Sequence, residues 1–147
     1  MKKGYWFFGF SGSGKTFASK YLKKKIKNSI VIDGDEVRKY ISFDLDYSQK
    51  HRDLQIRRVY GIARIAIKSN LFPIISTVWM SNLILKKAKS VGIKVIKINN
   101  NNNLNKKLIL RKIKKNIVGH DIFYENLKVD EITNSKDNNF KKLLCRI

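Results

Sequence analysis

The chain has 147 residues, which suffices for one domain with a buried core, and 43% of them are hydrophobic. No apolar run is long enough to cross a membrane or to serve as a signal peptide, and the single cysteine excludes an intrachain disulfide. We therefore expect a cytoplasmic protein without a membrane partner, folded as a single domain over residues 1–147.

The formal net charge is +21, and this charge has two explanations. A strongly basic surface attracts polyanions, so nucleic acid is one candidate partner. The 32 lysines and arginines are, however, spread along the chain and accompany many asparagines and isoleucines, as expected of an AT-rich coding sequence. We favour the second explanation and keep nucleic-acid binding as the less favoured one. The asparagine run at residues 99–103 fits the second explanation and predicts a polar loop of low complexity.

A phosphate-binding motif stands near the start of the chain. Residues 5–8, Y-W-F-F, are apolar without alternation, which is typical of a strand buried on both faces of a parallel sheet. They lead into G-F-S-G-S-G-K-T at residues 9–16, which has the spacing G-x-x-x-x-G-K-T. Apolar residues at helical spacing predict a helix over residues 15–27. Strand, loop and helix follow one another in the order that this motif requires, so we call residues 9–16 the phosphate loop.

The chemistry of the phosphate loop follows from its residue types. Glycines let the backbone turn its N–H groups toward a phosphate, and the following helix adds its positive N-terminal end. The Lys15 ammonium group would reach the β- and γ-phosphates of ATP, and the Thr16 hydroxyl would hold Mg²⁺. ATP and Mg²⁺ are therefore the expected cofactors. The predicted nucleotide-binding residues are Gly9, Ser11, Gly12, Ser13, Gly14, Lys15, Thr16 and Phe17.

Beyond the phosphate loop, strand-like and helical patterns alternate along the chain. Residues 29–32, S-I-V-I, predict a short strand that ends in the segment Asp33-Gly34-Asp35. A parallel strand delivers such carboxylates to the crevice where ligands bind. The alternation predicts an α/β fold with a mostly parallel sheet flanked by helices. The further expected elements are a short helix at 36–41, a polar-aromatic loop at 42–48, a helix at 49–69, a strand at 72–78, a helix at 82–90, a strand at 93–98, a helix at 104–115, an irregular stretch to Tyr124 and a helix near 136–144.

Several segments, taken together, carry a resemblance to a known family. The phosphate loop is followed by D-G-D-E-V-R at residues 33–38, by the pattern S-x-x-x-R-x-x-x-I-R-R-V at residues 48–59, and by a strand that ends in Ile75-Ser76. Residues 118–125 add V-G-H-D and a Tyr-Glu pair, similar to a T-G-x-D segment with Y-E shortly after it. In this combination the chain resembles the adenylylsulfate kinases, and the similarity runs from about Tyr5 to Asn134.

The resemblance implies a three-layer P-loop NTPase fold and transfer of the γ-phosphoryl group of ATP to the 3′-hydroxyl of adenylylsulfate. Phosphoryl transfer depends on positioning and charge neutralisation, for which this residue set suffices. Asp33 is the candidate to orient the acceptor hydroxyl and take its proton, so it is expected to be catalytic together with Lys15. Arg38 and Arg52 match positions that bind the phosphosulfate group, which suits their planar guanidinium forks. The implied metal residues are Thr16 and Asp35, and the implied acceptor-binding residues are Asp33, Asp35, Arg38, Tyr47, Arg52, Gln55, Ile75, Ser76 and Ile117.

The chain also departs from the family pattern. Gln55 stands where the family has Asn, and Thr77 stands where it usually has Pro. Ile117 replaces a Phe that stacks on adenine, which a branched aliphatic side chain cannot do in the same way; Tyr47 is the remaining candidate for an aromatic wall. Between Ile98 and Ile117 the family's R-D-x-K-G-L-Y lid segment is absent, although Arg111 is a candidate to replace its Arg.

These departures leave three alternatives open. The first is a kinase of another modified nucleotide, such as a cytidine diphosphate derivative used in decorating a surface polysaccharide. The second is a basic nucleic-acid-binding protein or polynucleotide kinase. The third is an inactive ATP-binding protein, since a catalytic lid supplies charge and excludes water. Whether the chain forms a homodimer is also left open.

Overall fold

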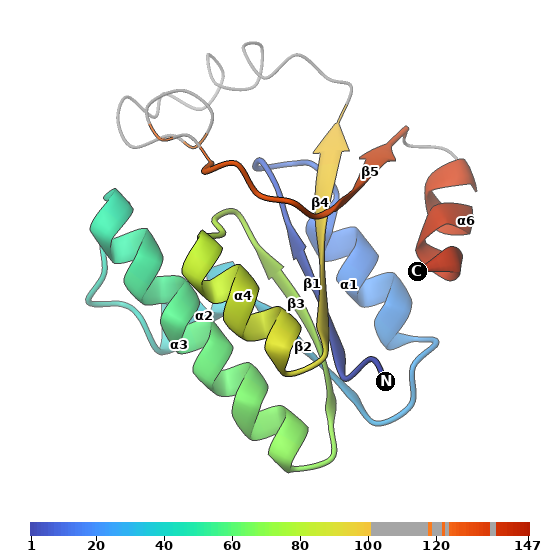
Figure 1. Ribbon diagram of the computed structural model, residues 1–147, viewed down its shortest axis with the longest axis horizontal. Coiled ribbons are helices and arrows are strands. Elements are labelled where there is room, and N and C mark those ends of the chain that lie inside the picture. The colour runs from blue at the N-terminus through green and yellow to red at the C-terminus, as the bar shows by residue number, and fades with distance from the viewer. Residues whose placement is uncertain (101–117, 119–121, 123, 136–137) are drawn as a thin grey trace.

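The computed structural model describes residues 1–100, 118, 122, 124–135 and 138–147 (Figure 1). Within these residues, five strands form one sheet in the order β2-β3-β1-β4-β5, and every neighbouring pair is parallel. The strands are β1 (Gly4–Phe8), β2 (Ser29–Asp33), β3 (Phe72–Thr77), β4 (Ile93–Asn100) and β5 (Asp130–Asn134). The helices are α1 (Lys15–Lys23), α2 (Gly34–Tyr40), α3 (Gln49–Lys68), α4 (Asn82–Ser90) and α6 (Asn138–Arg146).

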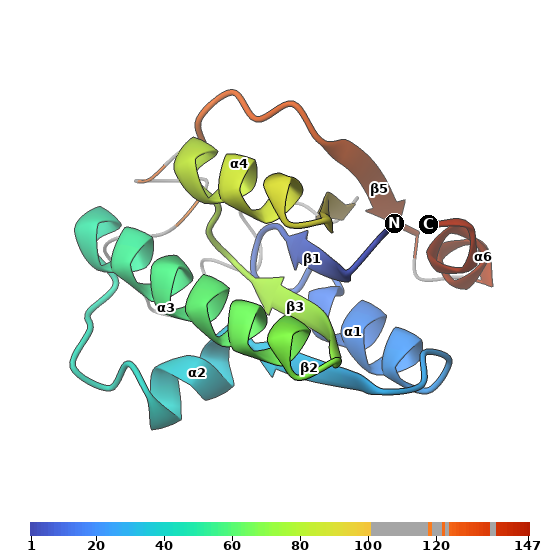
Figure 2. The ribbon, with the colours of Figure 1, turned by 60° about the horizontal axis from the view of Figure 1, so that its bottom comes forward.

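Helices cover both faces of the sheet, so the α/β fold in three layers is confirmed. In Figure 2, α1 and α6 lie on one side of the strands, and α3 and α4 lie on the other. Successive side chains of a strand point to opposite faces. Trp6 and Phe8 accordingly pack in the core cluster that contains residues of α3 and α4, whereas Tyr5 and Phe7 pack with residues of α1 and α6. The unbroken apolar run of β1 therefore fills both halves of the core.

The loops after β1 and β3 leave the sheet in opposite directions. These two strands are direct neighbours, with Phe8 opposite Thr77 at their carboxyl ends. β1 leads to α1 on one face, while β3 leads to α4 on the other face. This divergence marks the point of the carboxyl edge at which open α/β sheets bind their ligands. The phosphate loop and Ser76 both lie at this edge.

Several predicted elements needed correction. The short helix expected at 36–41 is α2, which begins two residues earlier at Gly34 and ends at Tyr40. The first helix ends at Lys23 and not near Lys27, because the chain then turns and reaches a positive φ of 50° at Asn28. The strand predicted at 93–98 continues to Asn100, so the polar loop expected at 99–103 is wrong for its first two residues. The last helix begins at Asn138 and ends at Arg146. Finally, β5 was not predicted at all.

β5 was missed because its sequence, D-E-I-T-N, has one apolar residue, Ile132. Its ion pairs come from the neighbouring strand: Lys94 binds Asp130 at 2.9 Å, and Lys97 binds Glu131 at 3.0 Å. Cross-strand pairs of opposite charge stabilise a sheet but leave no local periodicity in the sequence. The helix expected at 104–115 lies outside the described residues. No helix in the part of the chain that the structure describes is long and apolar enough to span a membrane.

Candidate active site

The phosphate loop adopts the backbone conformation that its glycines allow. Gly9, Gly12 and Gly14 have φ angles of 152°, 77° and 103°, a region that side chains with a Cβ rarely adopt. A Cβ at Gly9 would also lie 2.3 Å from the carbonyl oxygen of Ile98. Lys15 is buried and folds back over the loop, where its Nζ donates to the carbonyl of Phe10 at 2.7 Å. The loop therefore holds a cation at its centre, which suits it for a phosphate.

Asp33, at the carboxyl end of β2, connects three elements. As the N-cap of α2, its Oδ1 accepts a hydrogen bond from the backbone N–H of Asp35 at 2.9 Å. Its Oδ2 accepts from the hydroxyl of Thr16 at 3.1 Å and from the hydroxyl of Ser76 at 2.8 Å. A carboxylate has about four acceptor positions, so these three bonds orient it and leave room for a further donor. The structure thus brings the side chains of Thr16, Asp33 and Ser76 together.

The oxygen atoms at this point suit a magnesium ion. The Thr16 hydroxyl lies 3.1 Å from the Asp33 carboxylate, and Asp35 follows in the first turn of α2. Mg²⁺ prefers hard oxygen ligands and is commonly held by one or two protein groups together with substrate phosphates. The oxygen atoms of Thr16 and Asp33 therefore fit the cation, and the assignment of Asp35 to the metal stays a prediction.

Arg38 and Arg52 lie against the same aromatic ring. Their guanidinium carbons are 4.5 Å and 5.5 Å from the ring centroid of Tyr47. Arg38 donates to the carbonyls of Leu45 and Asp46, and Arg52 donates to the carbonyl of Tyr47 at 3.0 Å. Burial, and secondly the charge of Arg38, lower the pKa of Arg52 below its ordinary value. Two neighbouring cations, one of them buried, would be stabilised by a bound anion.

Gln55 belongs to α3, and its side chain reaches the first residue of α2. Its side-chain N–H donates to the carbonyl of Gly34 at 3.0 Å, and the residue is 5% exposed. Its Oε1 is buried and has no hydrogen-bond partner in the described structure. A buried acceptor without a partner costs about 1–3 kcal/mol, so a donor on a bound ligand would offset this cost. This contact places Gln55 next to Asp33 in space, because Gly34 follows Asp33 in the chain, and its role in acceptor binding stays a prediction.

For three other predicted site residues, the part of the chain that the structure describes shows no side-chain contact with the site above. Ile75 is fully buried in the core, so its predicted acceptor contact can involve only its main chain. Phe17 is about half exposed on α1, and its ring stacks on Tyr21 at 6.1 Å. Ile117 lies outside the described residues, as does Arg111. The assignments of these residues to nucleotide or acceptor binding stay predictions.

The turn after β3 contains contacts that sequence reasoning missed. The Thr77 hydroxyl accepts from the indole N–H of Trp6 at 2.8 Å and donates to the carbonyl of Trp79 at 2.9 Å. The indole N–H of Trp79 donates to the carboxylate of Asp53 at 2.7 Å, and its ring stacks on Tyr124. This turn is thereby tied to α3 next to Arg52. The only signal in the sequence was Thr77 itself, at a position where the family usually has Pro.

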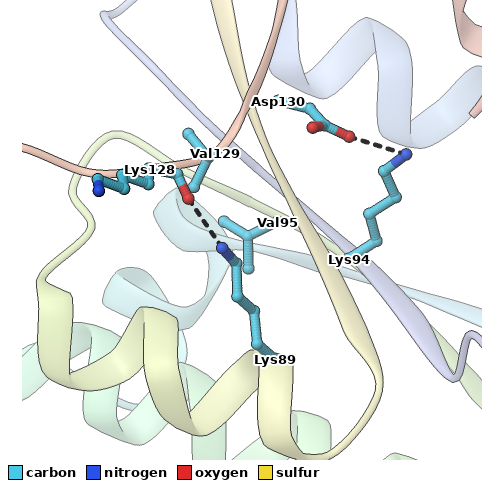
Figure 3. A pocket seen from close by; sticks show the side chains of 6 residues that line it. All are labelled: Lys89, Lys94, Val95, Lys128, Val129 and Asp130. Atoms are coloured by element: carbon cyan, nitrogen blue, oxygen red, sulfur yellow. Dashed lines mark hydrogen bonds and ion pairs between the residues drawn. The ribbon is translucent and has the colours of Figure 1, made fainter.

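A separate hollow of about 460 Å³ lies where β4 and β5 begin, at the opposite edge of the sheet from the phosphate loop (Figure 3). Two of the three lysines that line it contact the protein through their ammonium groups. Lys89 donates to the carbonyl of Lys128 at 2.8 Å, and Lys94 pairs with Asp130 at 2.9 Å. We assign no function to this hollow.

Comparison with known proteins identifies a family. A family model described as adenylylsulphate kinase matches residues 2–132. A probable adenylyl-sulfate kinase of Synechocystis is 32% identical over 77 residues, which are 50% of this chain and 44% of that protein. The adenylyl-sulfate kinase of Myxococcus xanthus is 36% identical over 66 residues, 43% of this chain and 36% of that protein. The structure of the Mycobacterium tuberculosis APS kinase CysC in complex with AMPPNP and APS matches with a TM-score of 0.79 at 20% identity, covering 99% and 98% of the two chains.

These matches differ in what they establish. The chain spans less than half the length of the two curated relatives. The solved structure, at 20% identity, shows the shared fold. The family model covers most of the chain, including the phosphate loop, Asp33 and the two arginines at Tyr47. The chain therefore belongs to the adenylylsulphate kinase family.

Proposed function

We propose that the chain is a kinase that transfers the γ-phosphoryl group of ATP to the 3′-hydroxyl group of adenylylsulfate. The observation that carries this proposal is the carboxylate of Asp33, which accepts hydrogen bonds from Thr16 of the phosphate loop and from Ser76 at the end of β3. It lies between the loop suited to the donor phosphates and α2, which carries Arg38. Family membership supports the same activity, and the M. tuberculosis relative binds AMPPNP and APS, that is, an ATP analogue and adenylylsulfate.

The phosphate loop would bind ATP. The ammonium group of Lys15, now on the carbonyl of Phe10, would neutralise charge on the β- and γ-phosphates. Mg²⁺, when bound, would supply further neutralisation of the phosphate charge. Thr16 and Asp35 would hold this ion through their oxygen atoms.

The acceptor would lie on the side of Tyr47. Arg38 and Arg52 would bind its phosphosulfate group, because each presents several N–H donors in one plane. The unpaired Oε1 of Gln55 would accept a hydrogen bond from the same nucleotide. The half-exposed ring of Tyr47 is available to stack on its base.

Asp33 would act on the reacting hydroxyl. It takes the proton of the 3′-hydroxyl as that oxygen forms a bond to the γ-phosphorus. The bond from the γ-phosphorus to the bridging oxygen breaks, and ADP leaves with that electron pair. The hydrogen bonds from Thr16, Ser76 and the N–H of Asp35 fix the carboxylate for this role, and such positioning contributes much of the rate in phosphoryl transfer.

The test is an ADP-release assay with Mg-ATP and a panel of acceptors that includes adenylylsulfate and cytidine diphosphate. We expect turnover with adenylylsulfate and none after Lys15→Ala. Asp33→Asn should lower kcat by about 10²- to 10⁴-fold while ATP binding is retained. Glu36→Gln, an exposed carboxylate in the first turn of the same helix, is the matched control and should run at the parent rate. Turnover with the cytidine nucleotide alone would refute the proposed acceptor, and an Asp33→Asn variant as fast as the parent would refute the proposed base.

Two further proposals follow from the sequence and the family, namely that residues 1–147 act as one kinase domain and that this domain is located in the cytoplasm. Whether the chain forms a homodimer stays open. Light scattering coupled to size-exclusion chromatography measures the mass of the particle and so tests the homodimer.

A further inference from the structure

Two asparagines reach the phosphate loop from the ends of neighbouring strands. Asn100 is the last residue of β4 and Asn134 is the last residue of β5, and they are direct partners in the parallel register. The side-chain N–H of Asn100 donates to the carbonyl of Gly12 at 3.1 Å. The side-chain N–H of Asn134 donates to the carbonyl of Ser13 at 3.0 Å. Two consecutive carbonyls of the loop are thus held by a matched pair of carboxamides.

Holding these carbonyls also orients the N–H groups of the loop. A peptide unit is planar and trans, so its N–H points to the side opposite its C=O. When Asn134 binds the carbonyl of Ser13, the N–H of Gly14 therefore faces away from β5. The peptide between Gly12 and Ser13 is held at both ends, because the N–H of Ser13 donates to the carbonyl of Phe10 at 3.1 Å. A loop that binds an anion through its N–H groups requires this kind of fixed peptide orientation.

The carboxamide of Asn134 packs directly on the loop backbone. A Cβ at Gly14 would lie 2.3 Å from the side-chain nitrogen of Asn134 and 3.2 Å from its Cγ. Gly14 is therefore required for two reasons: its φ of 103° and the close approach of Asn134. The glycine of the motif and the asparagine of β5 fit each other, although 120 positions separate them in the sequence numbering.

The two strand ends are in turn held together. Glu131 of β5 accepts hydrogen bonds from Lys97 at 3.0 Å and from Asn99 at 2.8 Å, both in β4. The parallel backbone ladder between the two strands, which does not depend on these side chains, keeps Asn100 and Asn134 at a constant spacing. β5 thereby links the C-terminal part of the chain to the phosphate loop at the carboxyl edge of the sheet (Figure 1).

We propose that Asn100 and Asn134 are positioning residues for ATP, which hold the phosphate loop in its binding conformation before the nucleotide arrives. The proposal rests on the proposed binding of ATP by this loop. Preorganisation strengthens binding by removing the cost of ordering the loop. From the usual contribution of one hydrogen bond, we expect Asn134→Ala and Asn100→Ala each to weaken ATP binding by about 3- to 10-fold. The double variant should weaken it by about 10- to 50-fold.

The test measures binding of Mg-AMPPNP by titration calorimetry, without any acceptor. Asn99→Ala is the matched control, since its amide binds Glu131 and not the loop, and it should bind as the parent does. Asn134→Asp keeps the shape of the side chain but turns a donor into an acceptor facing the carbonyl of Ser13, so it should weaken binding at least as much as Asn134→Ala. In steady-state kinetics the KM for ATP should rise while the KM for the acceptor stays unchanged.

The possible results test the positioning role and the proposed acceptor separately. Parent-like affinity in Asn134→Ala and Asn134→Asp, or equal weakening in Asn99→Ala, would overturn the positioning role. Weakened binding accompanied by an equal rise in both KM values would show a general loss of structure and would also overturn it. A parent protein that binds AMPPNP but does not phosphorylate adenylylsulfate would refute the proposed acceptor and leave the positioning role intact. A parent protein that does not bind AMPPNP would refute both.

Discussion

Replacing Arg52 by methionine should separate acceptor binding from stability. Arg52 is 9% exposed, and both burial and the neighbouring charge of Arg38 lower its pKa. Because the two guanidinium carbons are 4.5 Å and 5.5 Å from one ring centroid, they are at most about 10 Å apart. At an effective dielectric constant of about 20, their repulsion is at least about 1.7 kcal/mol. Removing this repulsion offsets the loss of the hydrogen bond to the carbonyl of Tyr47, which contributes about 0.5–1.5 kcal/mol.

We therefore expect the free energy of unfolding of the Arg52→Met variant to lie within about 1 kcal/mol of the parent value. Truncation of a well-packed buried side chain usually costs more, about 2–5 kcal/mol. Acceptor binding, in contrast, should be weakened strongly. Losing charge-assisted hydrogen bonds of about 2–3 kcal/mol would raise the KM for adenylylsulfate by about 30- to 150-fold, with the KM for ATP unchanged.

Urea unfolding measures the first quantity, and initial rates at varied acceptor concentration measure the second. Arg57→Met is the matched control, because Arg57 is an exposed residue of the same helix and should leave both quantities unchanged. A loss of stability above about 2 kcal/mol, together with an unchanged KM for the acceptor, would show that Arg52 supports the fold and would refute the anion-binding role.

Two further predictions concern contacts around the site. Trp79→Phe removes the N–H that binds Asp53 but keeps a ring against Tyr124. Urea unfolding should therefore show a free energy of unfolding lower by about 1.5–3 kcal/mol. Parent-like stability would contradict a role for this hydrogen bond. The hydrogen bond from Arg58 lowers the pKa of Asp44 below 3.8, so the folded state binds this proton less tightly than the unfolded chain. The stabilisation by the Arg58–Asp44 pair is therefore fully present above pH 3.8 and is lost as the pH falls below this value. The difference in melting temperature between the parent and Asp44→Asn should accordingly shrink from about pH 5 to about pH 3. A difference independent of pH would refute the pairing.

Much of the fold was predictable because its signals are local. The run Y-W-F-F of β1 is apolar on both faces, and helical spacing placed α3 and α4 to within one residue of their observed bounds. A period of two or 3.6 residues needs only neighbours in the chain to be recognised. β5 had no such signal, since its ion pairs belong to β4 and its pattern holds one apolar residue.

In the candidate site, too, the features predicted from the sequence are local and the features added by the structure are contacts between distant residues. The phosphate loop and the segment from Asp33 to Arg38 are contiguous, so their spacing already indicated the chemistry. The structure added the way in which Asp33 is held by Thr16 and Ser76, and the shared position of the two arginines on Tyr47.

Local sequence patterns were enough to predict a nucleotide site after β1 and an α/β sheet to carry it. The tertiary structure decided how the loop is held. Asn100 and Asn134 bind loop carbonyls 88 and 121 positions away in the sequence, and the indole of Trp6 binds Thr77, 71 positions away. Contacts of this kind arise when the parallel strands end at a common edge, and no spacing within the sequence encodes them. The asparagine run indicated only a polar loop in the sequence. In the structure, Asn100 of this run is the last residue of β4 and contacts the phosphate loop.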